Sequence, residues 1–163
     1  MHPCSECAKL YKTCCDTAEA GVTGGDIARI TAFTGRTDFY SLEPVSEEHK
    51  YSYENPWNCP DSGKIYVKYF FDEEGRRNIL KKNDKGGCIF LAQDGCMLPL
   101  GVRPIICRLY PYSWTDQREI SLEASSCPAH LFKDEQDLKE NLCVPEDEAL
   151  RLVNLFYDEI MNK

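Results

Sequence analysis

Residues 86–112 read GGCIFLAQDGCMLPLGVRPIICRLYPY and contain three of the chain's ten cysteines: Cys88, Cys96 and Cys107. A second group of four cysteines lies near the start of the chain: Cys4, Cys7, Cys14 and Cys15. The two-residue gap of a C-x-x-C sequence lets one turn direct two sulfurs at the same ion. A metal is also an efficient way to tie distant segments of a chain together. We therefore predict that thiolates of both groups bind a metal centre.

The candidate ligands are these seven thiols and one more, Cys127. Because adjacent side chains usually diverge, we expect only one of Cys14 and Cys15 at a given centre. The set is large enough for one centre with spare thiols or for two centres. Ligation by sulfur alone suits zinc and iron–sulfur clusters and disfavours magnesium and calcium. The predicted cofactor is therefore zinc or iron, the iron being mononuclear or part of a cluster. We interpret Cys59 and Cys143 as packing residues.

Length and charge set limits on the other function classes. The chain has 163 residues, which is enough for one domain and too few for two of ordinary size, so we expect a single domain over residues 1–163. Lys and Arg number 19 against 27 Asp and Glu, a formal net charge of −8. We therefore expect neither nucleic acid nor an anionic membrane as a partner. The first residues show no basic segment followed by an apolar one, so we expect a cytoplasmic protein with reduced thiols.

The remaining segments predict a small α+β fold with cysteine-rich loops. Thr23 and Asp26 are typical of a helix start, where Asp26 acts as a capping residue, and Gly35 is a plausible end. Alternating residues predict a strand over 64–71, and residues 76–82 a second strand that forms an antiparallel hairpin with it. A third strand is expected at Ile120, Leu122 and Ala124, and a polar helix is possible over 134–142.

A final helix is predicted over about residues 145–161. Pro145 is suited to a helix start, and three acidic residues follow it in the first turn. The expected inner face of this helix consists of Leu152, Val153, Phe156 and Ile160. The simplest role for that face is to pack on the core, and the alternative is to bind a partner.

The stretch from Gly95 to Tyr112, together with the amino-terminal cysteine group, resembles the CxxCxxCC cysteine-cluster family, whose members are described as zinc- or iron-chelating. The resemblance covers about residues 4–128, and its most specific part is the sequence RPIICRLYP from Arg103 to Pro111. It implies a thiolate-bound zinc or iron centre. Flagellin lysine methylases have a similar cysteine pattern and hold an iron–sulfur cluster. They are larger, so the resemblance implies the cluster more than the methyl transfer.

Two arginines flank Cys107 in this stretch. Four thiolates around Zn²⁺ or around a [4Fe–4S]²⁺ core leave two net negative charges. Arg103 and Arg108 are placed to neutralise that excess through hydrogen bonds to sulfur. The alternative is that they pair with some of the abundant acidic residues.

Three function classes follow from the sequence. The first is a metalloprotein whose centre fixes the fold. The second is an enzyme, either with Cys4 and Cys7 as a thiol–disulfide pair or with a cluster that assists modification of a protein. The third is a metal-delivery or interaction module that uses the aromatic segment 51–57 or the C-terminal helix. The sequence leaves open whether the protein is an enzyme.

Overall fold

The helix predicted from Thr23 is α3 (Gly24–Thr34). The computed structural model describes residues 9, 13–47, 64–123, 132–141 and 144–162. The Thr23 Oγ1 accepts a hydrogen bond from the Asp26 backbone N–H at 3.0 Å, and Asp26 Oδ2 accepts one from the Thr23 N–H at 3.0 Å. Gly35 ends the helix with a φ of 69°, a conformation that favours glycine. Both predicted ends are confirmed.

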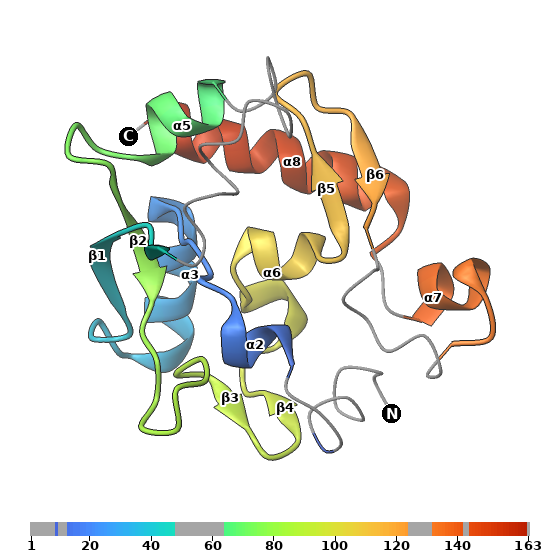
Figure 1. Ribbon diagram of the computed structural model, residues 1–163, viewed down its shortest axis with the longest axis horizontal. Coiled ribbons are helices and arrows are strands. Elements are labelled where there is room, and N and C mark those ends of the chain that lie inside the picture. The colour runs from blue at the N-terminus through green and yellow to red at the C-terminus, as the bar shows by residue number, and fades with distance from the viewer. Residues whose placement is uncertain (1–8, 10–12, 48–63, 124–131, 142–143, 163) are drawn as a thin grey trace.

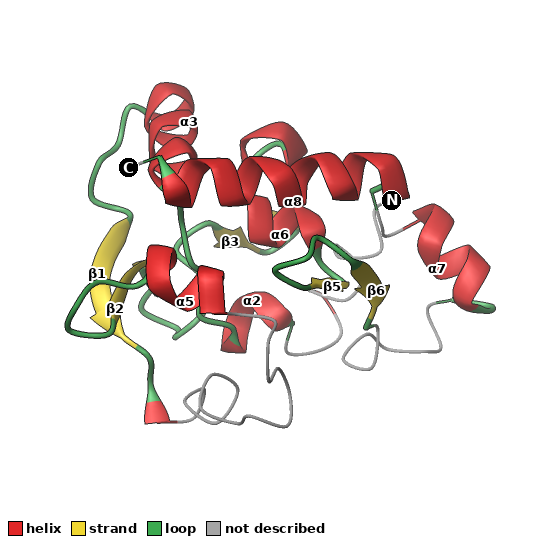
Figure 2. Ribbon diagram, turned by 90° about the horizontal axis from the view of Figure 1, so that it is seen from above, coloured by secondary structure: helices red, strands yellow, loops and turns green. Residues whose placement is uncertain are grey.

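The other elements form a mixed α and β fold, as predicted, in one small domain (Figure 1). In chain order they are α2 (Cys14–Thr17), β1 (Tyr40–Pro44), α5 (Lys64–Phe70), β2 (Arg76–Leu80), β3 (Leu91–Ala92), β4 (Gly95–Cys96), the 3₁₀ helix η1 (Leu100–Val102), α6 (Ile105–Leu109), β5 (Tyr112–Trp114), β6 (Ile120–Leu122), α7 (Glu135–Asn141) and α8 (Glu146–Met161). In both ribbon views α7 lies at the opposite end of the molecule from β1 and β2 (Figures 1 and 2).

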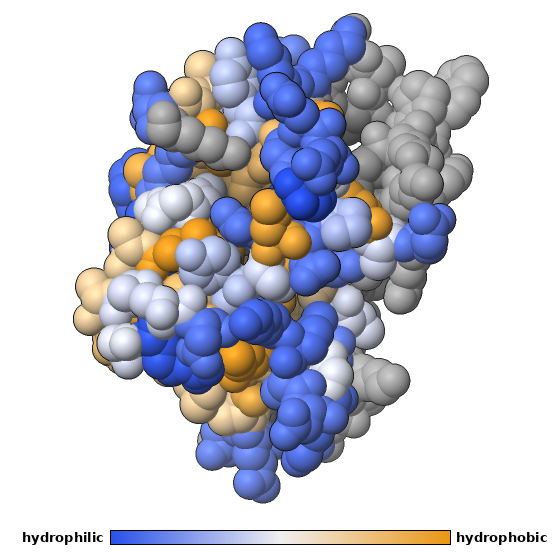
Figure 3. Space-filling model, turned by 90° about the vertical axis from the view of Figure 1, so that its left-hand side faces the viewer, coloured by the Kyte–Doolittle hydropathy of each residue, from blue (hydrophilic) through white to orange (hydrophobic). Residues whose placement is uncertain are grey.

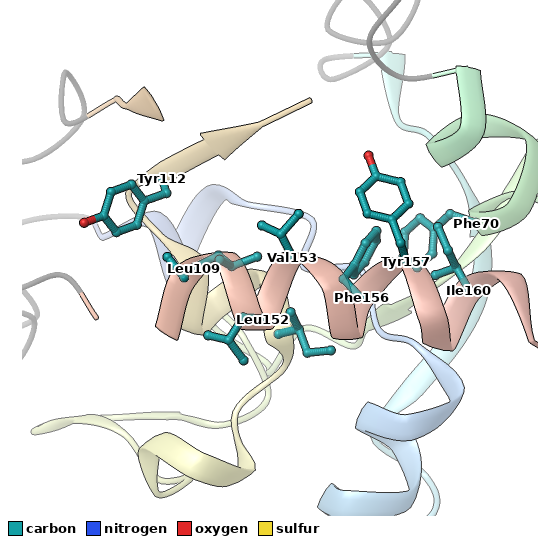
Figure 4. Packing of buried hydrophobic residues seen from close by; sticks show 10 residues of the cluster. Phe70, Leu109, Tyr112, Leu152, Val153, Phe156, Tyr157 and Ile160 are labelled. Carbon is teal, nitrogen blue, oxygen red and sulfur yellow. The ribbon is translucent and has the colours of Figure 1, made fainter. Parts of the chain in front are cut away.

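The predicted C-terminal helix is confirmed as α8, with Pro145 at its N-cap. Its expected inner face is buried: Leu152, Val153 and Phe156 are 0% exposed and Ile160 is 1% exposed. These side chains pack with Phe70 of α5, with Ile105 and Leu109 of α6, and with other buried residues (Figure 4). The face packs on the core, which is the simpler of the two roles expected for it.

The prediction of a strand over residues 64–71 is wrong, because that segment forms helix α5. The carboxylate of Asp116 accepts hydrogen bonds from the backbone N–H groups of Ile65 at 2.8 Å and Tyr66 at 3.3 Å. These are N–H groups that the start of a helix leaves without an intrahelical acceptor. The Tyr66 ring stacks on Phe156 of α8, with centroids 5.7 Å apart. Tertiary contacts thus decide the conformation of a segment whose apolar residues also alternate.

The strands pair in three short antiparallel sheets. Strand β2 lies within the predicted strand 76–82, but its partner is β1, with Tyr40 opposite Leu80. The hairpin partner expected over 64–71 is absent because that segment is helical. Strands β5 and β6 pair with Trp114 opposite Ile120, so the third predicted strand exists through Leu122, while Ala124 lies outside the described residues. Strands β3 and β4 form the third pair.

The described residues form two apolar clusters. The first surrounds α8 and includes α5 and α6. The second consists of six buried residues: Val22, Ile30, Phe39, Leu80, Phe90 and Leu98. Cys88 and Cys96 pack against the second cluster, whereas Ile105 and Leu109, on either side of Cys107, belong to the first. The cysteine-bearing segments of the 86–112 stretch therefore pack on different clusters: those of Cys88 and Cys96 on the second, and α6, which carries Cys107, on the first.

Hydrophilic side chains cover most of the face beside β1 and β2, and apolar ones form small separate patches on it (Figure 3). Among the residues that the structure describes, no helix has both the length and the apolar character needed to span a membrane.

Candidate metal centre

Five of the ten cysteines lie in the described part of the chain, and all five are free thiols. They come from four segments: Cys14 and Cys15 from α2, Cys88 from the turn before β3, Cys96 from β4 and Cys107 from α6. Cys14 is exposed, and the other four are partly buried. Figure 1 shows α6 between α8 and the β3–β4 hairpin, which brings the last two of these segments together.

Cys15 and Cys88 lie side by side although they are far apart in the sequence. The backbone N–H of Cys88 donates a hydrogen bond to the Cys15 carbonyl oxygen at 2.7 Å. Helix α2 is held in place by a capping box in which Asp16 Oδ2 accepts from the Thr13 N–H at 2.7 Å. The Asp16 carboxylate also approaches Gly87, where a Cβ atom would lie 3.2 Å from Oδ1. Helix α2, which carries Cys14 and Cys15, is thus attached to the segment that begins the second cysteine group.

The sulfurs of Cys88 and Cys96 each accept a hydrogen bond from the backbone of a nearby residue. The Cys88 sulfur accepts a hydrogen bond from the backbone N–H of Phe90 at 3.5 Å, and the Cys96 sulfur accepts one from the backbone of Leu98. In both cases the donor is two residues beyond the cysteine. The two segments are joined by the β3–β4 pairing, in which Leu91 lies opposite Cys96. A hydrogen bond from N–H to sulfur favours the ionised form of the sulfur, which is the form that binds metals.

Four of the sulfurs share one electrostatic neighbourhood. The pKa of Cys88 is raised to about 11, first by burial, with the charges of Cys15 and Cys96 acting in the same direction and the Phe90 N–H acting against it. Burial likewise raises the pKa of Cys107 well above its ordinary value, and the charges of Cys15, Cys88 and Cys96 act in the same direction. Burial also raises the pKa of Cys96. Like charges in a poorly solvated site oppose ionisation, and a bound cation reverses this effect.

Cys15 differs from the other three thiols. Its pKa is lowered to about 7, first by a hydrogen bond from the Cys14 side chain, with Thr13 and the charge of Arg103 acting in the same direction against burial. Cys15 therefore ionises most readily of the four. Its charge also acts on the thiols of Cys88, Cys96 and Cys107.

The two arginines that flank Cys107 have different surroundings. Arg103 Nε donates to the Leu98 carbonyl oxygen at 2.9 Å, and the Arg103 side chain also hydrogen-bonds to Cys96 and lowers its pKa against burial. Arg108 Nη2 instead donates to Glu148 Oε1 of α8 at 3.0 Å. Arg103 thus adjoins the sulfurs, whereas Arg108 has a carboxylate partner, which is the alternative considered for both.

The remaining predicted ligands, Cys4, Cys7 and Cys127, lie outside the described residues, as do Cys59 and Cys143. Within the described ranges, no three Cys, His, Asp or Glu side chains are arranged so that they could hold a metal ion. Cys15, Cys88 and Cys96 thus act electrostatically on Cys107, but the four sulfurs do not form a coordination shell. Binding of a metal ion by these four residues would require their sulfurs to move closer together.

Asp26 has a second contact that the sequence pattern did not predict. Besides capping α3, its Oδ1 accepts a hydrogen bond from the backbone N–H of Ile105 at 3.0 Å. Arg29 Nη2 donates to the same oxygen at 2.6 Å, and Asp26 is 0% exposed. Burial raises the pKa of Asp26, and the hydrogen bonds it accepts oppose this. The capping box predicts only the local bonds, because Ile105 carries no sequence signal for a partner so distant.

Comparisons with protein-family models, with curated proteins and with solved structures find no match to this chain. The function must therefore be inferred from the residues and their arrangement.

Proposed function

We propose that the protein is a metalloprotein whose centre, zinc or an iron–sulfur cluster, is held by the thiolates of Cys15, Cys88, Cys96 and Cys107. The observation that carries the proposal is the direct backbone contact between the Cys15 and Cys88 segments, 2.7 Å from nitrogen to oxygen. It brings Cys15 of the first cysteine group beside Cys88 of the second. The resemblance to the cysteine-cluster family remains a prediction and is consistent with this function.

The donor chemistry supports the same proposal. Thiolates bind zinc and iron–sulfur clusters well and bind magnesium or calcium poorly. The N–H groups of Phe90 and Leu98 and the side chain of Arg103 all favour negative charge on sulfur. Burial and mutual repulsion disfavour that charge when no cation is present. A metal ion is the kind of ligand that resolves this opposition.

The proposed centre would join four segments, of which α6 contributes to the first apolar cluster and those of Cys88 and Cys96 pack against the second. When bound, zinc supplies a cross-link, and an iron–sulfur cluster supplies in addition an electron-transfer centre. Cys14 remains outside the first set of ligands because it is exposed and its side chain hydrogen-bonds to Cys15. The charge of Arg103 offsets part of the negative charge of the four thiolates.

Metal analysis of protein purified without oxygen tests this function. We expect at least one zinc or several irons per chain. A visible charge-transfer absorption would identify iron, because zinc is silent there. A metal-free protein that is folded and whose stability does not respond to added zinc or to cluster reconstitution would reject the proposal.

Serine replacements then test the ligand set. Each of C15S, C88S, C96S and C107S should lower the metal content, because each removes a thiolate. C14S is the matched control, since it alters the neighbouring thiol on the same short helix. If C14S loses the metal and C15S keeps it, the assignment within the adjacent pair is wrong.

A further inference from the structure

Helix α6, which carries Cys107, is fixed at its start by a residue from another helix. The backbone N–H of Ile105 is one of the N–H groups that a helix start leaves without an intrahelical partner. It donates to Asp26 Oδ1 at 3.0 Å, across a contact between parts of the chain that are distant in sequence. Both ribbon views place α3 and α6 beside one another with α8 alongside (Figures 1 and 2).

The Asp26 carboxylate is itself held firmly. Its Oδ2 accepts from the Thr23 N–H at 3.0 Å, and its Oδ1 accepts from Arg29 Nη2 at 2.6 Å as well as from Ile105. Arg29 in turn donates from Nη1 to Glu159 Oε1 of α8 at 2.5 Å. In all three bonds an oxygen of Asp26 is the acceptor. Both oxygens are used, so the side chain must be a carboxylate, which has two accepting oxygens. The carboxylate thus locates α6 relative to both α3 and α8.

We propose that Asp26 is a positioning residue for the metal centre, because it fixes the helix start from which Cys107 reaches the other three sulfurs. The inference rests on the proposed function. It assigns to Asp26 a role in metal binding without placing it among the ligands. Residues that orient metal ligands affect metal affinity strongly, since replacing them typically weakens binding about 10- to 100-fold.

The two oxygens of the Asp26 carboxylate serve different elements: Oδ2 accepts from Thr23 at the start of α3, and Oδ1 accepts from Ile105 at the start of α6. Asparagine at this position keeps the shape but has only one accepting oxygen. Whichever way its amide is turned, either Thr23 or Ile105 loses its acceptor, so the link between the two helix starts is broken.

The test compares D26N with D116N in the full chain. Asp116 is a matched control: it is 6% exposed, it caps α5 through Ile65 and Tyr66, and it accepts from the Tyr157 hydroxyl at 2.7 Å. Those partners lie on helices without cysteines. Both variants lose one buried carboxylate that caps a helix, but only Asp26 contacts the helix that carries a candidate ligand.

Two measurements are made on each purified protein. Chelator competition gives the metal affinity, and X-ray absorption at the zinc or iron edge gives the number of sulfur neighbours. We expect D26N to lower the affinity about 10- to 100-fold and to lower the mean sulfur count, with D116N unchanged in both. The sulfur count is a readout that a general loss of stability in a still-folded protein would not move.

The outcomes separate the two proposals. If the unaltered protein binds no metal through sulfur, the proposed function is refuted. If it binds metal and D26N binds as tightly or more tightly with the same sulfur count, only the role of Asp26 is refuted, as it is if D116N shows an equal loss. Should D26N fail to fold, I105P and I105A answer the question, since both shorten the buried side chain and only proline removes the N–H. Equal metal affinity in these two variants would also refute the role.

Discussion

Replacing Phe156 by alanine is expected to lower the free energy of unfolding by about 4–5 kcal/mol. The side chain is 0% exposed and lies in the cluster that includes α5, α6 and α8. Removing a buried phenylalanine side chain costs about 3–5 kcal/mol. The upper part of that range applies because four aromatic rings surround it at centroid distances of 5.4 to 5.8 Å: Tyr66, Phe70, Trp114 and Tyr157.

This loss is a large share of the total stability, which is about 5–15 kcal/mol for a typical domain. Urea denaturation followed by circular dichroism measures it, provided that the slope of the transition is unchanged. F33A is the control, because Phe33 is 55% exposed and its replacement should change the stability by less than about 0.5 kcal/mol. A loss below about 2 kcal/mol for F156A would contradict the packing described for α8.

Three further predictions concern a close contact, a buried ion pair and the metal. G25A should destabilise the protein, because a Cβ there would collide with the carboxylate of Glu159. G24A is the control: its Cβ meets nothing within 4 Å, so in the same denaturation assay it should stabilise helix α3 by up to about 1 kcal/mol. Burial opposes ionisation of Glu19, but hydrogen bonds from Arg77 and Ser46 and the charge of Arg77 outweigh it and lower its pKa. The stabilisation from ionised Glu19 is therefore complete above the ordinary carboxyl pKa and is lost as the pH falls through the lowered pKa of Glu19. In E19Q the free energy of unfolding should fall less steeply as the pH is lowered. An unchanged dependence of stability on pH in the acid range would contradict this. Removing the metal with a chelator should lower the unfolding free energy by about 2.7 kcal/mol if free metal had stood at about 100 times its dissociation constant, and an identical melting curve after chelation would contradict the proposed centre.

Local signals in the sequence were sufficient for some elements. Thr23, Asp26 and Gly35 predicted both ends of α3, because caps depend on residues within a few positions of one another. The apolar spacing after Pro145 predicted α8 and its buried face for the same reason. The mixed α and β class was predicted from these elements and from strands at 64–71, 76–82 and 120–124, of which the first is helical in the structure.

Other features depend on contacts that no local pattern encodes. The segment 64–71 satisfies the period of a strand, but it forms a helix that the carboxylate of Asp116 caps and that packs on the Phe156 ring of α8. The bond between Asp26 and Ile105 joins a helix cap to a helix start that has no signal of its own. For the candidate site, the cysteine count and grouping predicted which residues to examine. The sequence could not predict that Cys15 would have its pKa lowered by its neighbour Cys14 and would act on the Cys88, Cys96 and Cys107 thiols.

The cysteine-bearing segments pack on different apolar clusters, and this bears on how the protein unfolds. Cys88 and Cys96 pack against one cluster, whereas Ile105 and Leu109, on either side of Cys107, belong to the other. An inorganic cross-link between these segments would make the melting of one cluster depend on the other, giving a single cooperative transition. Stripped of it, the two clusters are free to lose their structure at different denaturant concentrations, so the number of unfolding steps becomes a direct report of metal occupancy.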